Sequence, residues 1–266
     1  MEIIALVKKL KGQNYRVRTE SGLSFDVSED AIVRHRLLKG EELNHVAIEA
    51  VRQEAAMTVG YQKALYYLNT QLRSEKEVRD YLVRKEIDEG AIPNIIQRLK
   101  DLTLINDLLY AESYVRTMIR TSDKGPIVVR QQLKRRGIQK NFIVQALAQY
   151  SFDDQTAIAM HVAEKAMRKY VRKSHQEQKD KTRQQLFTKG FEADVIQLVM
   201  SELSAEKDTV AESALLKTAG DKLWHKHRKV EGYKRKQKVI ASLMQKGFSY
   251  DDIQHYLREK ELEESE

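Results

Sequence analysis

The sequence predicts an all-α protein, built from tandem three-helix (helix-turn-helix-like) repeats in an elongated, curved array and preceded by a small β-type N-terminal extension. Three observations lead to this prediction. The chain of 266 residues contains 2 Pro and 11 Gly, so little in it interrupts helices. After residue 43, apolar residues recur three and four positions apart, which is the period of an amphipathic helix. A block of ten residues also occurs four times, which is typical of repeat architectures.

The first 45 residues differ from the rest, because they contain short β-type runs. Turn residues separate these runs at residues 12–14 and 21–22, which predicts a three-stranded meander. Ser28 is a suitable N-cap, and Glu29 and Asp30 suit the first turn of a helix, so a helix is expected from there to about Lys39, ending at Gly40. The predicted strands lie at residues 3–7, 15–18 and 24–27.

The repeated block begins at Val78, Val129, Thr182 and Val239, at offsets of 51, 53 and 57 residues. Each copy reads as a helix that ends in a tight turn, followed by an apolar residue and a second amphipathic helix. Gly137, Gly190 and Gly247 are expected in the left-handed position of this turn. The leucines that match between copies are expected to be buried: Leu82, Leu133, Leu186 and Leu243.

A further amphipathic helix precedes each pair, at about residues 64–72, 108–120, 155–173 and 209–225. Each repeat is therefore a three-helix module, and a module of about 50 residues buries only about 60% of its unfolded surface, so it should lean on its neighbours. The expected domains are residues 1–45 (β-meander and helix), 46–103, 104–150, 151–203 and 204–258 (repeats 1 to 4), and 259–266 (acidic tail).

Several kinds of chemistry find no support in the sequence. The absence of cysteine excludes disulfides and thiolate sites, and no glycine-rich phosphate loop can be written, so we expect no enzyme, no cofactor and no metal. His225 and His227 point to different faces of a helix, which disfavours a metal site. The longest uncharged stretch, residues 141–152, is too short for a membrane span, and Met1 begins no apolar leader; a cytoplasmic monomer without membrane contact is expected.

Two other features have a structural interpretation. The acidic pairs at residues 153–154 and 251–252 are expected to cap helices, because each stands at a predicted helix start. Trp224, the single tryptophan, is expected in the core, because it lies at helical spacing from Leu216 and Leu223.

Positive charge is concentrated at module spacing. The formal net charge is +8, and residues 116–140, 165–189 and 222–238 each carry +7. One such segment is usually a solvated face, but three suggest a continuous basic track for a phosphate backbone. The basic track consists of Arg116, Arg120, Arg130, Lys134, Arg135, Arg136, Lys165, Arg168, Lys169 and Arg172. Its last four members form a stripe at i, i+3, i+4 and i+7 on one predicted helix.

Several strings resemble one family in the same order. They are residues 73–78 (RSEKEV) with Leu82, residues 104–107 (LIND) leading to 110–116 (YAESYVR), and residues 124–126 (KGP) leading to 129–138 (VRQQLKRRGI). Together they resemble the RecX regulators of the RecA recombinase over about residues 64–150. Later modules match through the repeat, and the β-type N-terminus resembles only longer members. Glu86 and Thr103 depart from the family pattern, which has Gly at both turns.

This resemblance implies a non-enzymatic modulator, mainly an inhibitor, that binds along the RecA filament and restrains strand exchange, ATPase and co-protease activity, with roles in DNA repair, recombination and the SOS response. The RecA filament is the expected partner, with single-stranded DNA as a second. Two alternatives stay open: an independent DNA-binding protein of tandem helix-turn-helix type, and a purely protein-binding helical scaffold. The first alternative has little support, because the third helices of two modules, at residues 141–149 and 194–201, would be the recognition helices and contain no Arg to contact base edges.

Overall fold

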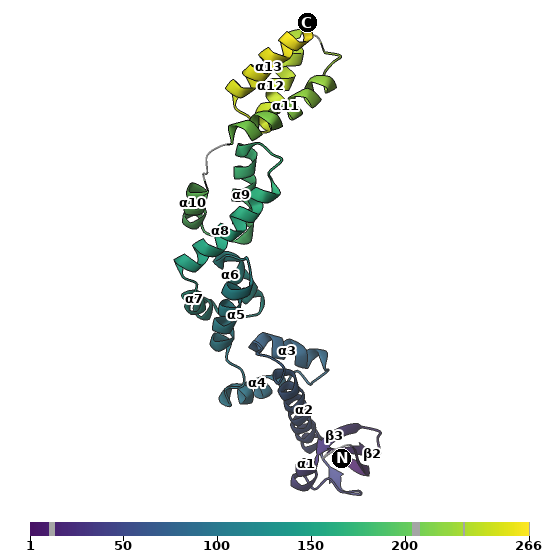
Figure 1. Ribbon diagram of the computed structural model, residues 1–266. Helices are drawn as coiled ribbons and strands as arrows, with labels where there is room; N and C mark the ends of the chain where they lie inside the picture. Colours follow the sequence, from purple (N-terminus) through teal and green to yellow (C-terminus); the bar gives the residue numbers. More distant parts are fainter. Residues whose placement is uncertain (11–13, 204–207, 231, 266) are drawn as a thin grey trace. The chain divides into compact units, whose positions relative to one another are not determined.

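The computed structural model describes residues 1–10, 14–203, 208–230 and 232–265. They are mostly helical, with a small antiparallel sheet near the N-terminus, which confirms the predicted fold class (Figure 1). Two compact units divide the chain: Met1–Tyr114 with Gln132–Ala146, and Val115–Gln131 with Leu147–Glu266. Within the described ranges, no helix combines the length and apolar character that a membrane crossing requires.

The N-terminal sheet has the strand order β3-β2-β1-β4, with β1 at Glu2–Lys9, β2 at Asn14–Thr19, β3 at Ser24–Ser28 and β4 at Glu42–Leu43. The first three strands form the predicted meander, in which Val17 lies opposite Val7 on one side and Phe25 on the other. Strand β4 was not predicted, because two residues carry no alternating pattern. The predicted turn at Gly12 and Gln13 falls outside the described residues.

Helix α1, Glu29–Arg34, is shorter than the sequence predicts. Ser28 caps its start as expected, since its hydroxyl accepts the Ala31 N–H at 3.3 Å. The prediction of an end near Lys39 was wrong, because Arg36 adopts φ +47° and Leu37 N–H bonds back to Ile32 O at 2.9 Å. This turn places Leu37 in the core, and burial of that side chain outweighs continuation of the helix.

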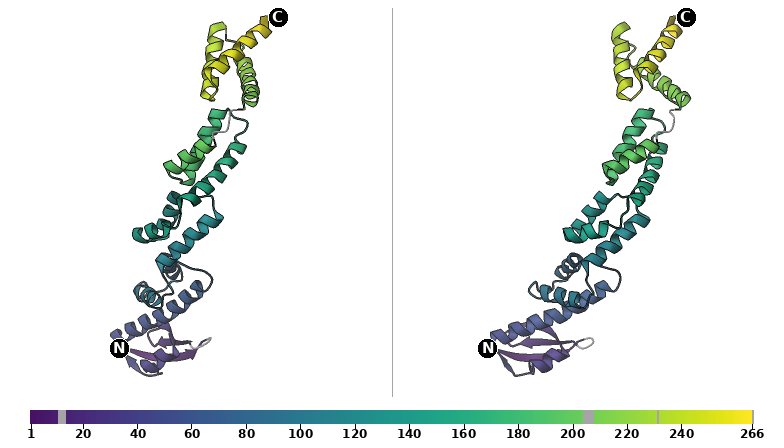
Figure 2. Two further views of the ribbon diagram at one scale, coloured as in Figure 1. Left: turned by 60° about the vertical axis from the view of Figure 1, so that its left-hand side comes forward. Right: turned by 90° about the vertical axis from the view of Figure 1, so that its left-hand side faces the viewer.

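Helix α2 spans His45–Leu68, so the prediction of a helix at residues 64–72 was wrong at both ends: α2 begins earlier and ends earlier. The Asn44 side chain accepts the Ala47 N–H at 2.8 Å and so starts the helix far earlier. Its first half packs Ile48 and Val51 against the sheet, and its second half packs Ala64 into the core of the first module. Figure 2 shows α2 continuing from the sheet to the next pair of helices.

The remaining helices follow in groups of three, as predicted. We number the modules 1 (second half of α2, α3, α4), 2 (α5–α7), 3 (α8–α10) and 4 (α11–α13). Helix α8 ends at Lys169 rather than at the predicted Lys173, because Tyr170 ends it and Ser174 already begins α9. The helices are α3 Glu75–Arg84, α4 Ile92–Asp101, α5 Asp107–Thr121, α6 Pro126–Arg135, α7 Lys140–Leu147, α8 Phe152–Lys169, α9 His175–Lys189, α10 Ala193–Glu202, α11 Thr209–Lys226, α12 Gly232–Gln245 and α13 Tyr250–Ser265.

The turn after the second helix of every module has the same hydrogen bonds. The apolar residue after the left-handed position donates its N–H to the carbonyl of the matched leucine, for example Phe191 to Leu186 at 3.3 Å and Phe248 to Leu243 at 3.2 Å. All four leucines are fully buried, as predicted. The left-handed residues are Glu86 (φ +57°), Gly137 (φ +81°), Gly190 (φ +86°) and Gly247 (φ +82°).

The other structural interpretations are confirmed as well. Trp224 is buried in the core of module 4 with Leu216 and Leu243. The acidic pairs lie in the first turns of α8 and α13, where negative charge is favourable.

Candidate functional site

Modules 1 and 2 meet where helix α3 begins. The Ser74 hydroxyl accepts the Glu77 N–H at 3.2 Å and donates to the carbonyl of Arg136 at 2.8 Å, just before the left-handed Gly137. Next to it, the Glu75 N–H donates to the Asp107 carboxylate at 2.8 Å, and burial raises the pKa of Asp107. The start of one module's second helix thus rests on the turn that ends the second helix of the next module. We call such a contact a joint.

The joint between modules 3 and 4 has the same parts. The Ser174 hydroxyl accepts the Glu177 N–H at 3.2 Å and donates to the carbonyl of Lys246, just before Gly247. The His175 N–H donates to the Glu212 carboxylate at 2.9 Å, as the Glu75 N–H does to Asp107 in the first joint. The two joints therefore repeat the same hydrogen bonds with different residues.

The joint between modules 2 and 3 uses main-chain donors instead of a serine. The Gly125 N–H donates to the Lys189 carbonyl at 2.8 Å, and the Ile127 N–H donates to the Gly190 carbonyl at 3.1 Å. An ion pair between the Lys189 ammonium and the Asp123 carboxylate, at 2.5 Å, lies beside these bonds. In all three joints the carbonyl of the basic residue before the glycine accepts a hydrogen bond, and in the middle joint the Gly190 carbonyl accepts a second one.

Close approach, as well as backbone conformation, demands glycine at these turns. A Cβ atom on Gly137 would lie 2.6 Å from the Lys76 Cβ, and one on Gly190 would lie 2.7 Å from the Val128 nitrogen. At the first module the Lys85 carbonyl accepts the Lys63 ammonium instead, at 3.3 Å. Glu86 can therefore stand in place of Gly, since it meets only the cost of the left-handed conformation.

Glu86→Gly should stabilise the protein by about 0.5–1 kcal/mol, because it relieves that conformational cost without disturbing a joint. Urea unfolding of the full chain measures the change. Glu89→Gly is the matched control, because Glu89 is exposed and has ordinary backbone angles. Glycine there should only raise the conformational entropy of the unfolded chain and so lower the free energy of unfolding slightly. Equal effects of the two substitutions would contradict the prediction.

The ion pair in the middle joint gives a pH dependence. The hydrogen bond from Lys189 lowers the pKa of Asp123, so the pair stabilises the fold above the unfolded-state pKa, about 3.9, and this stabilisation disappears as the pH falls through the lower folded-state value. Both side chains are partly exposed, so the effect should stay below about 1 kcal/mol. A double-mutant cycle of Asp123→Asn and Lys189→Gln should show coupling near pH 6 and none well below the Asp123 pKa. Coupling that does not change with pH would contradict this.

The structure places the basic track mostly at the protein surface. Arg116 and Arg120 lie on α5, Arg130 and Lys134 one turn apart on α6, and Lys165, Arg168 and Lys169 on α8. All members except the half-buried Arg136 are exposed. Among the described residues, six track members have no hydrogen-bond or ion-pair partner: Arg120, Arg130, Lys134, Arg135, Lys165 and Arg172.

The other members of the track have local contacts. Arg116 donates to Gln149 at 3.2 Å, Arg168 lies 3.6 Å from Glu164, and the Lys169 ammonium lies 5.3 Å from the Tyr170 ring. Arg136 has a structural role at the first joint, because its guanidinium stacks on the Tyr114 ring at 4.7 Å and lies 3.7 Å from the Glu77 carboxylate.

The predicted helical stripe is correct for Lys165, Arg168 and Lys169 but not for Arg172. That residue follows the end of α8, in the turn before α9.

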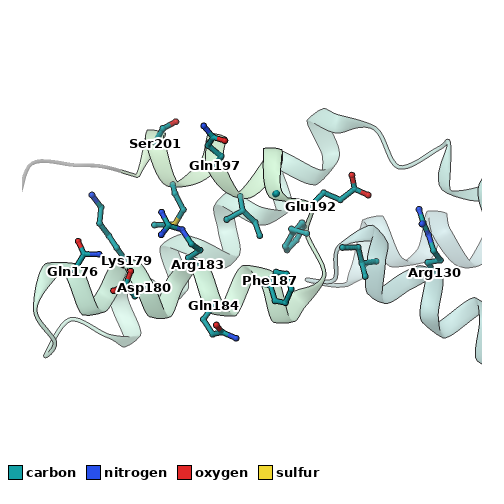
Figure 3. A pocket seen from close by; sticks show the side chains of 15 residues that line it. Arg130, Gln176, Lys179, Asp180, Arg183, Gln184, Phe187, Glu192, Gln197 and Ser201 are labelled. Atoms are coloured by element: carbon teal, nitrogen blue, oxygen red, sulfur yellow. Dashed lines mark hydrogen bonds between the residues drawn. The ribbon is translucent and has the colours of Figure 1, made fainter. Parts of the chain in front are cut away.

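A groove in module 3 adds residues that the sequence did not single out (Figure 3). It has a volume of about 1260 Å³ and lies along α9 and α10, with Arg130 of α6 at one end. Lys179, Arg183 and Phe187 stand on successive turns of α9 and line it. The Phe187 ring is 68% exposed, which is unusual for an aromatic side chain.

Comparison with known proteins places the chain in a family. The sequence patterns of the RecX first, second and third three-helix domains match residues 61–99, 106–147 and, for the third domain, both 153–200 and 211–257. The chain belongs to the RecX family. It is 44% identical to the regulatory protein RecX of Enterococcus faecalis, with all of both chains covered. The Levilactobacillus brevis protein of that name is 38% identical, with 97% of each chain covered.

Two solved RecX structures share the fold. A crystal structure of regulatory protein RecX is 32% identical, has a TM-score of 0.62, and is matched over all of its own chain and 76% of this one. RecX from Lactobacillus salivarius is 44% identical, has a TM-score of 0.53, and is matched over 96% of its chain and 56% of this one. The third RecX domain matches twice, once in module 3 and once in module 4.

Sequence reasoning located the repeat turns of this RecX chain but missed the joints and the groove. A signal for two joints is present, since Ser74 and Ser174 are each followed three residues later by Glu, which is the capping-box pattern. The groove leaves no comparable signal. Its residues come from α6, α9 and α10, and only the fold brings those helices together.

Proposed function

We propose that this RecX-family chain is a non-enzymatic modulator, mainly an inhibitor, of the RecA recombinase. It binds along the RecA–single-stranded DNA filament in the cytoplasm and restrains strand exchange, ATPase and co-protease activity. The observation that carries the proposal is the full-length match to proteins named regulatory protein RecX. The motif strings at residues 73–138, which resemble RecA regulators, lie within modules 1 and 2.

The joints support a mode of action by many weak contacts. Each module is hydrogen-bonded to the next, so once one module is bound its neighbours are held near the filament at high effective concentration. Among the described residues, six cations of the basic track have no hydrogen-bond or ion-pair partner and are available to phosphates or to acidic protein surface, although Lys165 also feels the charge of Asp123. A protein that binds one conformational state of the filament more tightly than another shifts the filament toward that state. A difference of about 1.4 kcal/mol in binding free energy shifts the equilibrium between the two states tenfold.

A titration into a RecA ATPase assay on single-stranded DNA tests the proposal. We expect inhibition at well below one copy per RecA subunit, because one chain of four modules can contact several subunits. The effect should follow occupancy, and the protein alone should hydrolyse neither ATP nor DNA. A folded protein that leaves RecA unaffected up to equimolar amounts would contradict the proposal and favour independent DNA binding.

A further inference from the structure

The groove of module 3 differs from the equivalent surfaces of the other modules in one respect. The residue after the matched leucine is Val83, Lys134 or Met244 elsewhere, but Phe187 in module 3. One turn earlier stands Arg183, whose counterpart in module 1, Arg79, is paired with Glu75 at 3.0 Å. Module 3 therefore presents an exposed aromatic ring with an arginine one helical turn away, about 6 Å along the axis.

The middle joint, between modules 2 and 3, places a further cation at one end of this groove. Because the Ile127 N–H is bonded to the Gly190 carbonyl at 3.1 Å, the first turn of α6 is held at the end of α9, and Arg130 follows one turn later in the groove wall. Among the described residues, Arg130, Lys179 and Arg183 have no acidic partner. The groove also holds two acids, Asp180, which accepts a hydrogen bond from the Gln176 amide at 3.0 Å, and Glu192, so its lining keeps a formal charge of +1. Figure 3 shows these side chains along the groove.

We propose that this groove binds a short stretch of single-stranded DNA, with a base stacked on Phe187 and phosphates contacted by Arg130, Lys179 and Arg183. An exposed aromatic ring and cations along the same groove are the combination with which proteins hold single strands. A protein helix would need a continuous apolar face, but Phe191, Ile196 and Met200 are buried, and Ile127 at the end of the groove is only 37% exposed.

Fluorescence anisotropy with the full chain and a labelled oligothymidylate of about 16 nucleotides tests the site. Phe187→Ala and Phe187→Leu should each weaken binding of the oligonucleotide about 5- to 100-fold, because neither side chain can stack on a base. Phe187→Tyr keeps an aromatic ring, so its affinity should stay within about twofold of the parent. Phe152→Ala, at a half-exposed phenylalanine at the start of α8, is the matched control and should have no effect. Phe187 is exposed, so circular dichroism should show an unchanged fold.

Salt dependence separates the two kinds of contact. Arg183→Gln should lower the slope of log affinity against log salt concentration by about 0.7, because one phosphate contact is lost. Phe187→Ala should lower the affinity but leave this slope unchanged. Arg84→Gln, at an exposed arginine of module 1, is the control and should change neither the affinity nor the slope. Full binding by Phe187→Leu, or equal effects of Phe187→Ala and Phe152→Ala, would overturn the site. So would unchanged DNA affinity with weakened RecA binding, since the groove would then hold a protein. Bare DNA is the probe, so this failure leaves the proposed RecA regulation standing.

Discussion

Gly190→Ala is expected to destabilise the protein by about 2–4 kcal/mol, one of the largest effects of any single methyl group in the chain. The left-handed conformation at φ +86° costs alanine about 1 kcal/mol. The added Cβ would also meet the Val128 nitrogen and its Cγ2 methyl at 2.7 Å, and such overpacking typically costs about 1–3 kcal/mol. Since the Val128 nitrogen is main chain, it cannot move away as a flexible side chain could.

Hydrogen exchange shows where this stability is lost. The Gly125 and Ile127 amides donate across the middle joint, so both should lose protection in Gly190→Ala. Gly40→Ala is the matched control, because Gly40 has φ +89° but nothing within 4 Å of the position that a Cβ would occupy. It should lose only about 1 kcal/mol and leave those amides protected. Equal losses in the two variants would show that the glycine serves conformation alone.

Reversal of Arg130, Lys134 and Lys169 to Glu is expected to weaken binding to RecA-coated single-stranded DNA at least tenfold at moderate salt while the fold stays intact. All three side chains are exposed, and exposed charges typically change stability by less than about 0.5 kcal/mol each. Arg130 and Lys134 share one face of α6, so their reversal turns two neighbouring positive charges into negative ones. Co-sedimentation with the filament at several salt concentrations measures the change.

The control for this experiment keeps the net charge equal. Reversal of Lys8, Lys39 and Arg84, exposed residues outside the basic track, changes the charge of the chain by the same amount. A general electrostatic attraction would weaken equally in both triple variants, whereas a local track would be affected only by the first. Filament binding within about twofold of the parent after the first reversal would make the track an ordinary solvated face.

Much of the fold could be predicted because the relevant interactions are local. Helix period, the glycine turns and the matched leucines are repeated in the sequence, and the four turns of the structure follow them. Errors occur where distant residues compete with local preference. Helix α1 ends early so that Leu37 can be buried, and α2 starts at His45 because its first half has a sheet to cover.

The candidate site was only partly predictable. Clusters of Arg and Lys can be read directly from a sequence, but the sequence does not show which of these side chains have hydrogen-bond or ion-pair partners in the fold. Arg136 stacks on Tyr114 at a joint, whereas Arg130 lies in the groove wall because Ile127 is hydrogen-bonded to Gly190, and within the described part of the chain Arg130 has no acidic partner. The basic track therefore stays a prediction, and the structure shows that its members differ in their local contacts.

By itself the sequence determined a basic, cysteine-free chain of tandem three-helix modules with RecX-like motifs, since composition, period and turn residues are properties of short segments. Only the tertiary structure decided that the glycine turns are also joints, and that Glu86 is tolerated where no such contact forms. It also decided that Phe187, Arg183 and Arg130 line one groove. The physical reason is that close approach and convergence depend on contacts between residues up to 72 positions apart, such as Ser174 and Lys246, and no local pattern records them.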